Sequence, residues 1–95
     1  MGKKHAMLQK LADMVDLPGE AIPGNTVIEL LSENRLMIEH HEGIRAYSRE
    51  RILVGVSFGQ AEIQGEALTL RQMTLQDLII TGRIASVLLH RRGDL

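Results

Sequence analysis

Four residues that could bind a metal ion or transfer protons follow one another in the middle of the chain: Glu39, His40, His41 and Glu42. Imidazole nitrogens and carboxylate oxygens are ligands of zinc, and paired carboxylates can also act as acid and base. Adjacent residues of a strand face opposite ways, so His40 and His41 are poorly placed to hold one ion. A metal site also takes ligands from a second segment, whereas His5 and His90 lie near the chain ends. We therefore predict no metal and no cofactor, and we interpret this run as the polar end of a strand.

Nucleophilic catalysis has no recognisable motif in this chain. The serines Ser32, Ser48, Ser57 and Ser86 lack the glycine-flanked turn of a nucleophilic serine, and there is no cysteine. The glycines are dispersed and form no phosphate-binding loop. The remaining carboxylate pair, Glu62 and Glu66, is expected at solvated positions, where a carboxyl group makes a poor acid catalyst at neutral pH. We predict that the protein is not an enzyme.

Composition limits the class of protein further. A chain of 95 residues forms one domain, and because aromatic residues make up only 2% of it, its core must be aliphatic. With 11 Lys and Arg against 12 Asp and Glu, the chain lacks the basic excess of a nucleic-acid binder. The absence of cysteine excludes disulfides, and no apolar run is long enough to insert into a membrane. We expect a soluble, cytoplasmic protein that binds no nucleic acid.

Apolar residues alternate with polar or small residues through most of the chain, as in Ile52, Val54 and Val56, which indicates strands with one buried face. The predicted strands are 26–31, 35–40, 43–47, 51–57, 60–64, 67–73, 77–82 and 84–90. Phe58-Gly59 and Gly65-Glu66 are each expected to close a tight hairpin. The predicted fold class is mainly β, with short antiparallel strands in a meander, a two-layer sheet or a solenoid-like roll.

The first residues have a different period. Apolar residues at helical spacing predict one amphipathic α-helix over residues 1–18, which Pro18 ends: Met7, Leu8, Leu11, Met14 and Val15. We assign residues 19–25 to a linker, 26–90 to the β domain and 91–95 to a tail. The helix has no Trp or Phe to anchor it on a membrane surface, so packing on the sheet or on a partner is favoured.

A set of short motifs, in a fixed order, spans residues 7–89 of the chain. The motifs are Asp16-Leu17-Pro18, Ile38-Glu39-His40-His41-Glu42-Gly43-Ile44, Ile63-Gln64-Gly65 and Leu78-Ile79-Ile80-Thr81-Gly82-Arg83-Ile84. In this order and spacing the chain resembles the YabP/YqfC family of sporulation proteins, and within it the YqfC branch. Glu39, His41, Gly43 and Ile44 match the family's hairpin motif, whereas His40 and Glu42 stand where that motif usually has Asn and Arg.

The resemblance implies a role in endospore formation, in the mother cell and at the forespore surface through a partner. It also implies a protein partner, such as a membrane protein of the YqfD type, and it brings no enzymatic activity with it. On the resemblance, Glu39, His41, Gly43 and Ile44 are the candidate partner contacts.

We therefore expect a non-enzymatic assembly or scaffold protein that acts by protein–protein association, as a homo-oligomer or with another protein. Three alternatives stay open at this point. The first is a small β-barrel module that binds a ligand or nucleic acid. The second is a hydrolase or metal enzyme that uses the cluster from Glu39 to Glu42. The third is a subunit whose fold is completed by another chain.

Overall fold

The structure is a computed structural model that describes residues 24–93. The predicted helix over residues 1–18, most of the linker and the last residues of the tail lie outside the described residues. That helix therefore stays a prediction.

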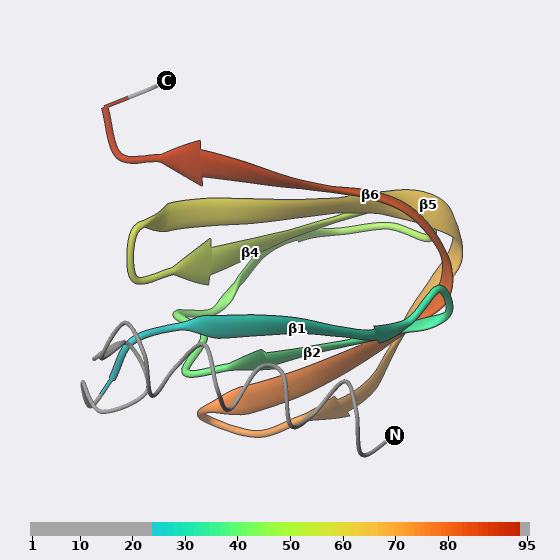
Figure 1. Cartoon of the computed structure of the whole chain (residues 1–95), viewed down its shortest axis with the longest axis horizontal. Helices are drawn as coiled ribbons and strands as arrows, with labels where there is room; N and C mark the ends of the chain where they lie inside the picture. Colours follow the sequence, from blue (N-terminus) through green and yellow to red (C-terminus); the bar gives the residue numbers. More distant parts are fainter. Residues whose placement is uncertain (1–23, 94–95) are drawn as a thin grey trace, which may run out of the picture.

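The described residues form six strands in one open sheet (Figure 1). The strands are β1 (Val27–Ser32), β2 (Arg35–Glu39), β3 (Ile44–Tyr47), β4 (Arg51–Val56), β5 (Gly59–Met73) and β6 (Asp77–Arg91). Their order across the sheet is β1-β2-β6-β5-β4-β3, and every neighbouring pair is antiparallel. The mainly β fold class is thus confirmed, and the solenoid-like alternative is wrong because a solenoid coil stacks its strands in parallel.

Two of the predicted boundaries are wrong, because β5 and β6 are each one long strand where the alternation predicted two. Gly65 and Glu66 do not close a hairpin; they pair with Ile84 and Arg83 of β6, and the register shifts on either side of them. Such shifts are β-bulges, which bend a strand without ending it. The Phe58-Gly59 hairpin is confirmed, since Val56 pairs directly with Gly59.

Bending of β5 and β6 folds the sheet over on itself, so that two halves of one sheet face each other (Figure 1). One half contains β1, β2, the start of β6 and the end of β5; the other contains β3, β4 and the remainder of the two long strands. The core between them is entirely aliphatic, as predicted. Its fully buried members are Leu36, Ile38, Ile52, Val54, Val56, Ala61, Ile63, Leu68, Leu78 and Ile80.

Polar contacts close the fold where the two halves meet at one end. The Thr26 hydroxyl accepts a hydrogen bond from Ser57 N at 2.8 Å and donates one to His40 O at 2.8 Å. In return, Thr26 N donates to the Ser57 hydroxyl at 3.2 Å. These bonds tie the start of β1 to the β4–β5 turn and to the end of β2. Within residues 24–93 there is no helix that could cross a membrane.

Candidate functional site

The outer face of β4, β5 and β6 carries the four hydrogen bonds that join two side chains in the described residues. Strand register aligns its residues in three rows that cross these strands: Gly55–Gln60–His90, Leu53–Glu62–Leu88 and Arg51–Gln64–Ser86. Neighbours in a row lie close enough for their side chains to interact, and long side chains also reach the adjacent rows. A carboxylate at the centre is therefore within reach of donors on all three strands.

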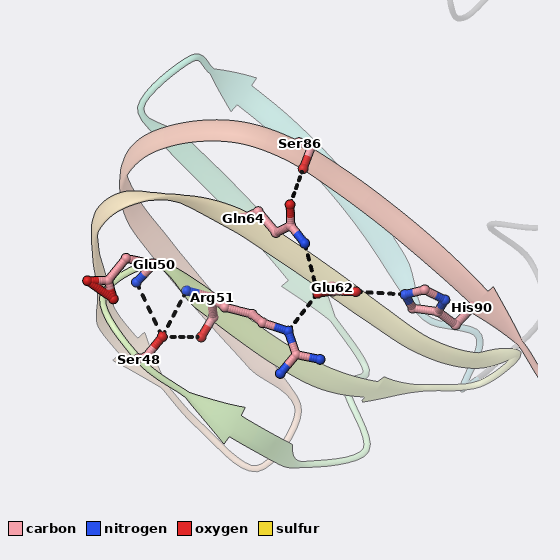
Figure 2. Close-up of polar contacts among 7 residues, drawn as sticks. All are labelled: Ser48, Glu50, Arg51, Glu62, Gln64, Ser86 and His90. Carbon is pink, nitrogen blue, oxygen red and sulfur yellow. Dashed lines mark hydrogen bonds and ion pairs between the residues drawn. The ribbon is translucent and has the colours of Figure 1, made fainter. Parts of the chain in front are cut away.

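Glu62 occupies that centre and is only 8% exposed. Arg51 Nε donates to its Oε2 at 2.6 Å, and Gln64 Nε2 donates to the same oxygen at 2.9 Å (Figure 2). His90 Nε2 lies 2.8 Å from the other oxygen, Oε1. Each partner sits one row away from Glu62, which explains how three strands supply donors to one carboxylate.

These donors lower the pKa of Glu62 from 4.5 to about 2, with the Arg51 hydrogen bond as the largest cause, followed by those from Gln64 and His90. Burial acts in the opposite direction but is outweighed, since hydrogen bonds to a carboxylate favour its charged form. The expectation that Glu62 is solvated is wrong. Glu62 is ionised at neutral pH, so it has no proton to donate as a general acid.

The β3–β4 turn positions Arg51 for this contact. The Ser48 hydroxyl accepts hydrogen bonds from Glu50 N at 3.3 Å and from Arg51 N at 3.0 Å (Figure 2). Ser48 N donates in turn to Arg51 O at 2.8 Å. A serine hydroxyl that bonds the backbone two and three residues ahead fixes a tight turn. Ser48 therefore stabilises the turn that precedes β4, which begins at Arg51.

The pair of Glu62 and His90 has the carboxylate–imidazole arrangement that many hydrolases use, but it lacks a nucleophile. In residues 24–93 no hydroxyl is hydrogen-bonded to His90, and the Ser86 hydroxyl donates instead to Gln64 Oε1 at 3.4 Å. A triad needs the nucleophile and the base within hydrogen-bond reach. The arrangement instead joins three strands through one charged group.

The candidate partner contacts lie at the end of β2 and in the β2–β3 connection. His41 Nε2 is 2.9 Å from Thr74 O, and Gly43 N donates to His41 Nδ1 at 3.0 Å. Nδ1 must then be the unprotonated nitrogen, so Nε2 donates to Thr74 and fastens this connection to the β5–β6 turn. Gly43 has φ 104°, which favours glycine, and Ile44 packs against the core. Glu39, the last residue of β2, pairs with Asp77 of β6.

The structure thus brings His41 and Gly43 together, with Ile44 next to them, while Glu39 belongs to the opposite half of the sheet. Their role in binding a partner stays a prediction. His40 has φ 60°, and its Nδ1 is buried without a hydrogen-bond partner in the described structure. Across the described range, no three histidine, aspartate or glutamate residues cluster in a way that could hold a metal ion.

Sequence reasoning overlooked Arg51, Gln64 and His90 as a group. Along the chain they lie 11, 2 and 28 residues from Glu62, so no local motif joins them. The only available signal was that Glu62 and Gln64 fall on the polar side of an alternating strand. Which residues oppose them depends on strand pairing, which the alternation does not specify.

The bent open sheet and its ionised polar network define a small β protein without a recognisable catalytic arrangement in the described part of the chain. The sequence model of the YabP family matches residues 24–94, most of the chain, and the protein belongs to this family. Membership indicates a sporulation-related protein, in a family that is not known for enzymatic activity. No curated protein and no solved structure matches the chain.

Proposed function

We propose that this protein is a non-enzymatic assembly component of endospore formation that acts by protein–protein association. Family membership supports the link to sporulation. The observation that carries the association is the edge of the sheet at β1, whose outer side has no neighbouring strand in residues 24–93 and where Leu30 is 58% exposed and Leu31 is 48% exposed. Unpaired strand edges are ready templates for another strand.

The β1 edge suits association better than the opposite edge does. β1 has six residues against four in β3, so an added strand would form more backbone hydrogen bonds along it. Cross-strand side chains of the added strand would also cover part of the two exposed leucines, one on each face, and each Å² of apolar surface buried contributes about 25 cal/mol. We propose a second copy of the chain as one partner at this edge. On the family resemblance, a YqfD-type membrane protein is the proposed further partner, reached from the cytoplasm of the mother cell.

A charge-block experiment tests the proposal. Lysine on an exposed edge strand opposes pairing, so the double variant Leu30→Lys/Leu31→Lys should be monomeric where the natural protein self-associates. The matched control is Leu75→Lys, which changes a 96% exposed leucine in the β5–β6 turn and should leave association unchanged. Light scattering after size exclusion, over a range of protein concentrations, measures the oligomeric state.

The same variants test the biological role. In a spore-forming host, the double lysine variant should reduce the yield of heat-resistant spores, and Leu75→Lys should not. A natural protein that stays monomeric at every concentration, together with full spore yield from the double variant, would contradict the proposal.

A further inference from the structure

A second polar feature lies beside the Glu62 network, at the end of the outer face where β5 begins and β6 ends. It is a surface pocket of about 320 Å³, which we call the arginine pocket, lined by Arg45, Gly59, Gln60, His90, Arg91 and Arg92. Three arginines and one histidine thus line one pocket on a chain whose net charge is only −1. The concentration of positive charge is local to this end of the sheet.

Two glycines permit close approach at this end of the sheet. A Cβ at Gly55 would collide with the guanidinium of Arg45, so that group lies against the bare backbone of β4. A Cβ at Gly59 would collide with His90 O, so only glycine lets the start of β5 lie this close to the end of β6. Phe58 holds the end of β6 and the residue after it. Arg92 N donates to Phe58 O at 3.0 Å, and the Arg91 guanidinium lies 5.9 Å from the centre of the Phe58 ring.

Within residues 24–93, few carboxylates pair with the positive charges of the pocket. Arg92 lies 3.6 Å from Glu42, in an exposed ion pair, while Glu62 points its carboxylate at Arg51, Gln64 and His90. In the described region, Arg45 and Arg91 form no ion pair with any carboxylate. Guanidinium groups bind carboxylates and phosphates through paired hydrogen bonds, so this pocket is suited to an anionic group.

The neighbouring sheet edge indicates the form in which that anion arrives. Arg45 belongs to β3, the other edge strand, whose outer side has no neighbouring strand in residues 24–93. An extended peptide that pairs along β3 places every second side chain on one face of the sheet. A carboxylate side chain on the face that holds Arg45 would then lie at the arginine pocket.

We propose that the arginine pocket and the β3 edge together form a docking site for an acidic, extended segment of a protein partner. The inference rests on the proposed function, since it assigns a second contact surface to the same assembly role. Backbone pairing along β3 provides the register, and Arg45, next to the other arginines that line the pocket, selects for acidic side chains.

Direct binding to a synthetic peptide tests the proposal. The probe is a fluorescent hexapeptide in which Glu alternates with Thr, and binding is measured by fluorescence anisotropy. A glutamine version of the peptide should bind more weakly by about tenfold or more, because its charge-assisted hydrogen bonds are lost. A version with N-methylated backbone amides should also bind more weakly, because it cannot pair with β3. Added salt should weaken binding, as expected for exposed charges.

Matched arginine variants locate the site. Arg45→Gln and Arg91→Gln should each weaken binding of the acidic peptide, whereas Arg71→Gln, an exposed arginine near the far end of β5, should have no effect. Thermal unfolding of each variant shows whether the fold is retained, which we expect because Arg45 is exposed.

Inorganic phosphate and a single-stranded oligonucleotide serve as alternative anions. Loss of binding in Arg45→Gln and Arg91→Gln but not in Arg71→Gln would support the proposal. Tight binding of either alternative anion with no binding of the peptide would overturn it, as would equal loss in all three variants. If self-association through β1 persists while the peptide fails to bind, this inference fails and the proposed function stands.

Discussion

At the scale of single residues, the Glu62 carboxylate is a buried ionised group held by three side-chain hydrogen bonds. Its three partners lie on β4, β5 and β6, so one charge links three strands on the outer face of the sheet. Hydrogen bonds to an ionised group are shorter and stronger than neutral ones, and leaving any partner of such a network unpaired is costly. The network is therefore a source of rigidity for the face that carries the arginine pocket, with His90 common to both.

Acid should weaken the protein through Glu62. Its pKa is about 2 in the folded protein and 4.5 when unperturbed, so the unfolded chain takes up the proton more readily. The stabilisation is thus fully present above pH 4.5 and is lost as the pH falls from 4.5 towards 2. Chemical denaturation at a series of pH values should show this decline, and Glu62→Gln should lower stability at pH 7 and flatten the decline.

Glu66→Gln is the matched control for this prediction. Glu66 is exposed and lies 4.0 Å from Arg83, a surface ion pair of a kind that contributes little to stability. Its variant should retain the acid-dependent loss. An identical pH profile for the natural protein and for Glu62→Gln would show that the network does not stabilise the fold.

At the scale of elements, the two long strands decide the shape of the molecule. Their bends occur where glycine permits close backbone approach: a Cβ at Gly65 would collide with Arg83 O, and one at Gly82 would lie 2.6 Å from Ala67 O. Gly82 has φ 131° and Ala67 has φ 52°, both in the region that L-residues avoid. The close approach of the two strands at the bend therefore requires glycine at position 82.

Gly82→Ala should destabilise the protein by about 1–3 kcal/mol, because it adds both backbone strain and a backbone collision at the bend. Gly43→Ala is the control, since φ is 104° there but no atom lies within 4 Å of the added Cβ. Its cost should be smaller, about 1 kcal/mol. Urea denaturation of both variants measures the difference, and equal costs would mean that the close approach at Gly82 contributes nothing.

At the scale of the whole molecule, one aliphatic core holds together two halves of the same sheet. Ile38 comes from one half and Ile63 from the other, and both are completely buried. Because the halves share this core and two continuous strands, neither can lose its packing alone. We expect a single cooperative unfolding transition, as is usual for domains of this size.

Ile38→Ala and Ile63→Ala should each destabilise the whole protein by about 2–5 kcal/mol, the usual cost of emptying a core site. In both variants fluorescence of Tyr47 and circular dichroism should report the same midpoint. Leu75→Ala, at a 96% exposed position, should change stability by less than about 0.5 kcal/mol. Two separate transitions in either isoleucine variant would contradict the shared core.

The sequence by itself determined the local features of this protein. Alternation located β1 to β4 to within a residue or two and predicted their buried face, as at Ile52 and Val54, because side-chain direction along a strand depends only on position parity. Phe58-Gly59 marked a hairpin for equally local reasons. The ordered motifs from Asp16 to Ile84 also sufficed to identify the family.

Only the tertiary structure decided which strands pair and which residues they bring into contact. Gly65 looked like a turn residue, yet it continues a strand, because β6 runs alongside and supplies its partners. Glu62 looked solvated, yet it is buried, because Arg51 and His90 approach it from neighbouring strands. Strand order and register come from contacts between residues far apart in the chain, and a local period of two carries no information about which strands pair.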